Sequence, residues 1–340
     1  RGFSAPVILD MDQPEEDLRF RMIHDSDGVN RWDAGQALML KAFDRGLIAY
    51  GKKEPLPEED ALVAALGQMI DAMKDDKRAL LGRMLTLPED AIVAATHQPT
   101  DPAAIHAVRC HLEKVIGTKL KDRLLALYEA NATSGAFSLS PDAVAKRALR
   151  NISLELLVSS DQVLGLKLAR AQYESAVTMT ERLGALRAIS SLSRAERDGL
   201  MTDFYNKFKD HELVVDKWFQ LQAGAARDTV IQDIHALLEH PAFTWKNPNR
   251  VRSALGSYAL RNMTGFHHPS GEGYELLADA VIKLNGINPA VAARLLTPMR
   301  GWKTFVPDLS QKMKDQLQRI LQSGDLSPDV YEVVSKTLNA

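Results

Sequence analysis

The chain contains 340 residues, of which 45% are hydrophobic and 25% are charged, and its formal net charge is −2. This composition is that of an ordinary soluble globular protein, and the length fits about two domains or one extended repeat architecture. The near-neutral charge argues against nucleic-acid binding by the chain as a whole, while a local basic patch stays compatible with it.

Neither a membrane span nor a targeting segment is recognisable. No run of about 18 apolar residues is present, and no signal peptide is visible. The single cysteine, Cys110, excludes an internal disulfide and a Cys-rich zinc site, which fits a reducing compartment. We therefore expect a cytoplasmic location. Because the chain begins at Arg1 and not at a Met, we also expect a piece of a longer or processed protein, whose own targeting stays open.

The first twelve residues are predicted to be the only strand. Val7 and Ile8 are β-branched, and Pro6 suits an edge or the start of a strand. A lone strand is not stable in water. We therefore expect residues 1–12 to be the terminal strand of a preceding β-sandwich, and residues 13–340 to form a separate helical domain.

From residue 13 onward the signals are helical. Carboxylate runs at Glu15-Glu16 and at Glu58-Glu59-Asp60 suit helix starts, where acids complement the helix dipole. Capping boxes and Pro-containing starts are predicted at Thr86-x-x-Glu89, Ser140-Pro141, Thr178-x-x-Glu181, Ser193-x-x-Glu196 and Ser327-Pro328. Apolar residues recur at helical spacing at Tyr274, Leu277, Val281 and Leu284, and at Met313, Leu317, Ile320 and Leu321. Typical lengths then give on the order of sixteen helices.

So many short helices favour an all-α superhelical solenoid of stacked helix pairs, similar to HEAT or armadillo repeats. The clearest internal repeat is the pair Asn247-Pro248 and Asn288-Pro289, which lie 41 residues apart. Asn is a favoured N-cap and Pro a favoured first helical residue, so each pair predicts a helix start. The spacing lies in the range of HEAT and armadillo repeats, and the rest of the chain shows no regular consensus.

The expected catalytic and metal-binding patterns are missing. His211-Glu212 would begin a zinc-peptidase helix, but Val215 stands where the second histidine is needed. We interpret this segment as an exposed start of a helix that buries Val214, Val215, Trp218 and Phe219, with Asp216 and Lys217 in an exposed ion pair. His267-His268 lacks a third ligand, and Cys110 with His106 and His111 is interpreted as incidental. The prediction is that this chain has no catalytic residue and no metal ligand.

Arginines near the two Asn-Pro starts raise a different question. Cations are mildly unfavourable at a helix N-terminus, yet Arg250 and Arg252 lie close to one. At 100° per residue they point to opposite sides of the helix. In a solenoid, Arg252 and Arg294 would then lie on neighbouring helices of one face, where two guanidinium groups could bind carboxylate or phosphate. The alternative is that both arginines form ion pairs with nearby Asp or Glu.

Several strings, taken together, resemble one known family. They are the opening Arg1–Val7, RWDAGQAL (31–38), RALRN (147–151), VVDKWFQLQA (214–223), NPNRVRS (247–253) and NPAVAARL (288–295). In this order they resemble the C-terminal region of bacterial-type aminopeptidase N, a gluzincin zinc aminopeptidase, over essentially the whole chain.

The resemblance implies a non-catalytic helical domain of an enzyme that removes N-terminal amino acids from peptides. It implies that the domain caps a catalytic domain that holds the zinc, follows a β-sandwich, and walls the substrate chamber. Carried over by motif, Arg252 and Arg294 would meet the distal part of the peptide. Ala290 departs from relatives that can carry a polar side chain there, which puts the distal preference in doubt.

The implied partners are the catalytic and β-sandwich domains of the same parent and the peptide substrate, with no nucleic acid and no membrane. Self-association of the isolated piece is left open. The parent would be an enzyme, and this chain alone is expected to be inactive. The competing hypothesis is an independent α-solenoid that binds a protein partner without any peptidase.

Overall fold

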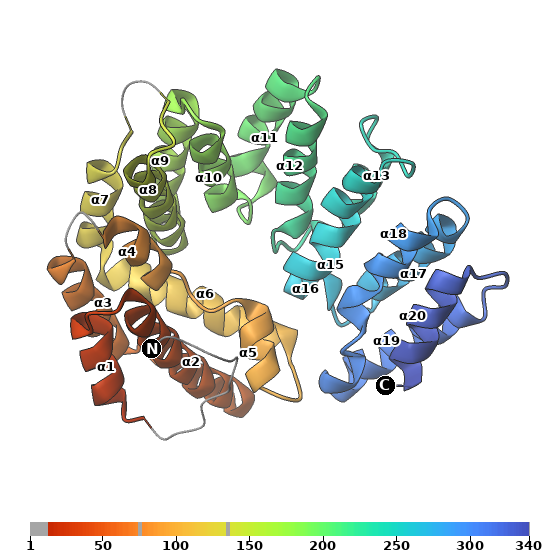
Figure 1. Ribbon diagram of the computed structural model, residues 1–340, viewed down its shortest axis with the longest axis horizontal. Helices are drawn as coiled ribbons and strands as arrows, with labels where there is room; N and C mark the ends of the chain where they lie inside the picture. The colour runs from red at the N-terminus through yellow and green to blue at the C-terminus, as the bar shows by residue number, and fades with distance from the viewer. Residues whose placement is uncertain (1–12, 74–76, 134–136, 340) are drawn as a thin grey trace. The chain divides into compact units, whose positions relative to one another are not determined.

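The computed structural model describes residues 13–73, 77–133 and 137–339 (Figure 1). The predicted strand at residues 1–12 lies outside this range. The chain divides into two compact units, each built from two separate stretches. Unit 1 comprises residues 1–93 and 107–188, and unit 2 comprises residues 94–106 and 189–340.

The described part of unit 1 consists of helices, three of which, α5, α6 and α10, include residues of unit 2. They are α1 (Glu15–His24), α2 (Gly28–Lys52), α3 (Asp60–Ala72), α4 (Arg78–Met84), α5 (Asp90–Thr96), α6 (Pro102–Lys119), α7 (Lys121–Ala130), α8 (Pro141–Ser160), α9 (Gln162–Ser175) and α10 (Met179–Ile189). Helix α8 packs against α4, α7 and α9, so it forms the centre of this unit.

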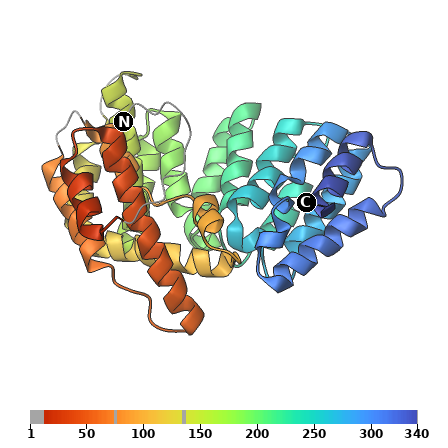
Figure 2. The same cartoon turned by 60° about the horizontal axis from the view of Figure 1, so that its bottom comes forward.

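Unit 2 is helical as well (Figure 2). Its elements are α11 (Arg194–Phe208), α12 (Glu212–Gly224), α13 (Val230–Glu239), α14 (Pro248–Val251), the π-turn η2 (Arg252–Gly256), α15 (Ser257–Arg261), α16 (Met263–Phe266), α17 (Glu272–Asn285), α18 (Pro289–Leu295), the 3₁₀ turns η3 (Thr297–Met299) and η4 (Trp302–Thr304), α19 (Pro307–Leu321) and α20 (Pro328–Asn339). Helix α17 packs on α18 and α19, and α20 packs on the same two helices.

Most predicted helix starts are confirmed. Ser193 and Glu196 form a full capping box at α11, and Thr178 and Glu181 exchange the same pair of bonds at α10. Ser140 caps α8, and the Ser327 hydroxyl accepts a bond from the first turn of α20. The prediction at Thr86 is wrong, because its hydroxyl bonds back to Gly82 O at the end of α4.

The carboxylates that were predicted at helix starts also link neighbouring helices to one another. Arg45 of α2 donates to Glu15 Oε1 at the start of α1 and to Glu59 Oε2 before α3, each at 2.5 Å. A planar guanidinium satisfies two carboxylates at once, so it ties the three helices together. Twenty α-helical segments lie in the described residues, more than the sixteen expected, because short segments such as α14 and α16 have no periodic signal of their own.

One contact in unit 2 joins stretches that are far apart in the sequence. The Thr100 amide donates to Thr304 O at 2.7 Å, and the Val306 amide donates to Thr100 O at 3.0 Å. These bonds form an isolated parallel bridge between Thr100 and Phe305. It attaches residues 94–106 to the segment between α18 and α19, and Thr100 is 1% exposed.

Candidate functional site

The helix that starts at Asn247 is enclosed on nearly every side. The Asn247 side chain accepts bonds from the amides of Asn249 and Arg250, and Pro248 is the first helical residue, as predicted. Between Val251 and Leu260 only Arg252, Gly256 and Leu260 are not buried. This stretch is therefore buried around most of its circumference, because α12 packs closely along it.

Arg250 and Arg252 do lie on opposite sides. Arg250 is 5% exposed, and its Nε donates to Asp216 Oδ1 at 2.6 Å. Its guanidinium also lies over the Phe219 ring, 4.9 Å from the centroid. The prediction of an exposed ion pair at Asp216 is thus wrong: this carboxylate is buried and bound by Arg250, which holds α14 on α12.

Arg252 is exposed and is held by its own helix. Its Nε donates to Pro248 O at 3.2 Å, and its Nη2 donates to Asn249 Oδ1. No ion pair of Arg252 is found among the described residues, so the predicted alternative of a nearby acid does not describe it.

Arg294 is the one exposed residue between Val291 and Leu296 on α18. Among the described residues its guanidinium has no hydrogen bond and no ion pair. Helix α18 contacts the π-turn that begins with Arg252. The two predicted arginines therefore lie on neighbouring elements, each as an exposed cation on an otherwise buried stretch.

The histidine segments do not form a metal site. His211 is exposed before α12, and Val215 is buried, as the near miss with the zinc motif predicted. His267 is buried between Tyr274, whose hydroxyl lies 2.8 Å from Nδ1, and Phe305, which stacks on the ring. His268 is exposed and bonds with Ser270. Over the described ranges, no group of three His, Cys, Asp or Glu side chains is placed to hold a metal.

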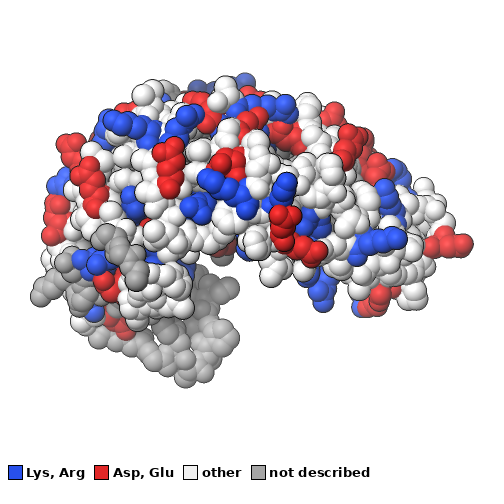
Figure 3. Space-filling view, turned by 90° about the horizontal axis from the view of Figure 1, so that it is seen from above, with Lys and Arg blue, Asp and Glu red and all other residues white. Residues whose placement is uncertain are grey.

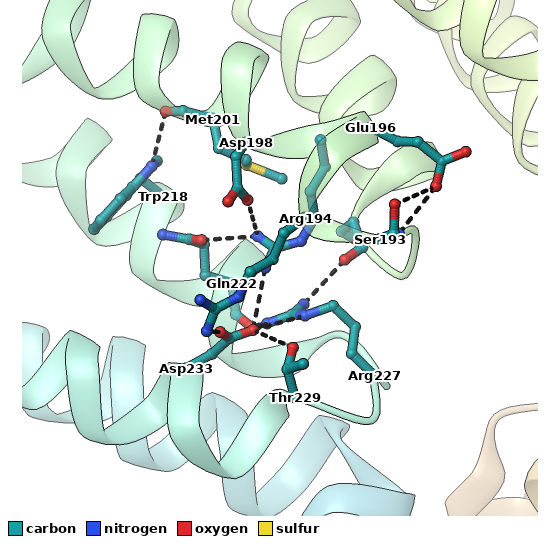
Figure 4. A network of polar contacts seen from close by, with 12 residues as sticks. Ser193, Arg194, Glu196, Asp198, Met201, Trp218, Gln222, Arg227, Thr229 and Asp233 are labelled. Atoms are coloured by element: carbon teal, nitrogen blue, oxygen red, sulfur yellow. Dashed lines mark hydrogen bonds and ion pairs between the residues drawn. The ribbon is translucent and has the colours of Figure 1, made fainter.

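A cluster of charged residues in unit 2 was missed by the sequence analysis (Figure 4). Asp233 on α13 accepts bonds from three arginines: Arg194, Arg197 at 3.1 Å, and Arg227 at 2.9 Å. Burial favours a higher pKa for this carboxyl, but the arginines outweigh it and lower the pKa. The only signal was the spacing of Arg194 and Arg197, three residues apart on one helix face, and nothing pointed to Asp233 as their partner.

A cavity of about 1070 Å³ lies beside this cluster. Its lining comes from the starts of α11, α13 and α17, from α16, and from the beginning of α6, and it includes Arg194, Arg227, Asp228, Glu272, His106 and His268. Charges of both signs line it, so the cavity favours neither anionic nor cationic ligands.

The side of the molecule displayed in Figure 3 shows no broad basic face over the described residues. In Figure 3, Lys and Arg alternate with Asp and Glu over the side displayed. Nucleic-acid binders need clustered cations to neutralise several phosphates. In the described part of the chain, no helix has both the length and the hydropathy to cross a bilayer.

Comparison with known proteins gives consistent matches along the whole chain. Residues 15–339 match the family model of a domain of unknown function, DUF3458_C, described as ARM repeats. The chain is 37% identical to aminopeptidase N of Caulobacter vibrioides and 35% identical to aminopeptidase N of Haemophilus influenzae and of Escherichia coli. These alignments cover 99% of this chain and 38–39% of the relatives.

A solved structure of an aminopeptidase also matches the whole chain. The chain is similar to aminopeptidase A of Legionella pneumophila, whose crystal structure contains aspartic acid, with a TM-score of 0.89 and 26% identity. The match covers 100% of this chain and 40% of the other. The all-α repeat fold and the family resemblance predicted from the sequence are thereby confirmed. The chain spans about two fifths of the length of the proteins it resembles.

Proposed function

Because the chain belongs to the DUF3458_C family of ARM-repeat domains and matches part of aminopeptidase N along its whole length, we propose that it is the non-catalytic helical domain of a zinc aminopeptidase. The parent enzyme would remove N-terminal amino acids from peptides. The observation that carries the proposal is the whole-length similarity to aminopeptidases from several organisms.

In this proposal the chemistry belongs to another part of the parent. A catalytic zinc needs about three protein ligands and an open position. The described residues offer no such group, so we assign the zinc to a catalytic domain outside this chain. Residues 1–12 would be the last strand of a β-sandwich, residues 13–340 the helical domain, and the parent would be cytoplasmic.

The helical domain would cap the catalytic domain and wall its substrate chamber. Arg252 and Arg294 would contact the distal part of the peptide. Their placement supports this role, since both are exposed, neither has an acidic partner among the described residues, and their elements touch. Guanidinium groups bind carboxylates and carbonyl oxygens through several N–H donors at once.

The first test compares short and long substrates in the full-length protein that carries this chain. Arg294→Ala and Arg252→Ala should raise KM for tetrapeptides about 12- to 160-fold, since a hydrogen bond to a charged group contributes about 1.5–3 kcal/mol. Single-residue anilides should be hydrolysed as by the wild type. The matched control is Arg261→Ala, an exposed arginine at the end of α15. An equal loss for anilides and tetrapeptides would contradict the distal role.

A second test asks whether the chain belongs to a peptidase at all. This chain should not hydrolyse alanyl, leucyl or arginyl anilides alone, and should support hydrolysis when mixed with the remaining part of the parent. Activity of the chain alone that a chelator removes would place a metal site here and contradict the proposal. Inactivity of the mixture, with both parts folded, would favour an independent interaction module.

A further inference from the structure

The contacts of Arg252 restrict how it can bind a ligand. A guanidinium has five N–H donors, one on Nε and two on each terminal nitrogen. The helix uses the donor on Nε, which bonds to Pro248 O, and one donor on Nη2, which bonds to Asn249 Oδ1. Both lie on the same edge of the group. The free donors are the two on Nη1 and the second one on Nη2.

One donor from each terminal nitrogen forms the end-on fork of an arginine. Such a fork matches the two oxygens of a carboxylate, which it binds through two parallel bonds. Because the helix occupies the edge formed by Nε and Nη2, the end-on fork is the pair of parallel donors that Arg252 keeps free on its two terminal nitrogens. The ligand it suits is therefore a carboxylate approaching along the axis of the side chain.

The backbone around Arg252 is built for a fixed position. Arg252 is the first residue of the π-helical turn η2, and π-bulges of this kind inside α-helices are frequent at functional sites. The residues that follow it, Ser253, Ala254 and Leu255, are buried. Gln220 of α12 also donates to the Ser253 hydroxyl at 3.3 Å. The Cα of Arg252 is thus held by packing, and Asn249 restrains the far end of its side chain.

Arg294 provides a contrast within the same molecule. The residue after the Asn-Pro pair is Asn249 in the first helix and Ala290 in the second. Neither the Ala290 side chain nor that of Val291, which stands three residues before Arg294 as Asn249 does before Arg252, has an acceptor, and the Arg294 guanidinium has no hydrogen bond to the described residues. Arg252 is therefore positioned before a ligand arrives, whereas Arg294 must be ordered by it.

We propose that Asn249 is a positioning residue that holds Arg252 so that its end-on fork receives a carboxylate of the bound peptide. This inference rests on the proposed function of Arg252. A side chain already in place loses less conformational entropy on binding, so removing Asn249 should weaken binding about 2- to 12-fold, the cost of ordering one long side chain.

The test measures KM and kcat of the full-length protein for three tetrapeptides. One has a free C-terminal carboxylate, one has a C-terminal amide, and one has the amide together with an aspartate at its third position. Asn249→Ala should raise KM about 2- to 12-fold for the peptide whose carboxylate Arg252 binds, with kcat unchanged. The three peptides distinguish a terminal from a side-chain carboxylate. Lys246→Ala, which changes an exposed residue just before the helix, is the control and should have no effect.

The double variant separates positioning from a structural role. Once Arg252 is alanine, the further change Asn249→Ala should have no effect, because Asn249 acts through Arg252. If Arg252→Ala weakens binding but Asn249→Ala does not, or if Asn249→Ala weakens the amide peptide without aspartate equally, this inference is wrong and the proposed function stands. If Arg252→Ala itself leaves all three peptides unchanged, the distal role of Arg252 and this inference both fail.

Discussion

Three guanidinium groups share the carboxylate of Asp233, and two of them have little access to water. Arg197 and Arg227 have side chains that are 2% and 4% exposed, and Asp233 is 8% exposed. A buried charge that loses its partner keeps its desolvation cost, whereas an exposed pair contributes little. At the scale of single residues, stability therefore depends strongly on this one aspartate.

Asp233→Asn is expected to lower the free energy of unfolding by about 3–5 kcal/mol, because the amide keeps the shape but leaves the arginines without their shared charge. Urea unfolding of the wild type and the variant measures this change. The control is Glu332→Gln, which removes an exposed ion pair with Lys336 and should cost less than about 0.5 kcal/mol. Similar losses for the two variants would contradict the special role of Asp233.

His267 should make the protein less stable in mild acid. Burial lowers its pKa to about 3, whereas the unfolded chain titrates near the ordinary value of 6.5. Below pH 6.5 the unfolded state binds the additional proton, so stability falls as the pH decreases, by about 1.4 kcal/mol per unit until pH 3. Between pH 7 and pH 5 the contribution is about 2 kcal/mol.

His267→Gln should remove this part of the pH dependence. Unfolding in urea at pH 7 and at pH 5 gives the loss for the wild type and for the variant, and the two losses should differ by about 2 kcal/mol. The exposed neighbour provides the control, since His268→Gln should leave the wild-type dependence intact. A loss in His267→Gln as large as in the wild type would show that other groups cause it.

At the scale of helices, the starts were predictable because their signals are local. A cap such as Asn288 and the residues it bonds lie within one turn, so the sequence alone contains the interaction. The π-turn at Arg252 was not predictable, since it occurs where α12 presses along a helix that comes later in the chain. The predicted helix start at Thr86 was wrong for a similar reason. The Thr86 hydroxyl can bond to the turn before it as well as to the turn after it, and tertiary structure decides between the two.

Close contact between helices gives a prediction at this scale. A methyl group at Gly117 of α6 would lie 2.8 Å from Ser160 Cβ of α8, closer than real contacts allow. Gly117→Ala should therefore cost about 1–3 kcal/mol of stability through overpacking. Gly51→Ala on α2 meets no neighbour and should instead stabilise the protein by about 0.5–1 kcal/mol through helix propensity. Thermal unfolding of both variants is the measurement, and a destabilised Gly51→Ala would count against this account.

At the scale of the whole molecule, periodicity and caps predicted the all-α repeat class, while the two-part division of the chain was not predictable. The bridge between Thr100 and Phe305 has no sequence signal, because it consists of backbone bonds that any residue pair could form. The candidate site was predictable in part. Resemblance selected Arg252 and Arg294, but the contact of Arg252 with Asn249 depends on side-chain geometry that no motif records.

Hydrogen exchange should reveal this bridge as one unit of stability. The amides of Thr100 and Val306 are bonded across it, and only its opening releases both. They are expected to exchange with the same free energy of opening, after correction for intrinsic rates. The amide of Ser270, which bonds within an exposed turn, should exchange faster. Different opening energies for Thr100 and Val306 would mean that the bridge does not open as a whole.

Because the chain passes between the two units more than once, its path also has a consequence for recombination between related genes. The chain leaves unit 1 after Val93, returns to it after His106 in the first third of α6, and leaves it again after Ala188. A genetic exchange that joined two related genes near residue 188 would combine residues 94–106 of one parent with the unit 2 of the other. The side chains of Thr100, Ala104 and Ile105 are buried, so only parents that agree at these buried positions would yield a stable hybrid. Recombination within this family should therefore favour breakpoints that keep residues 94–340 from one source.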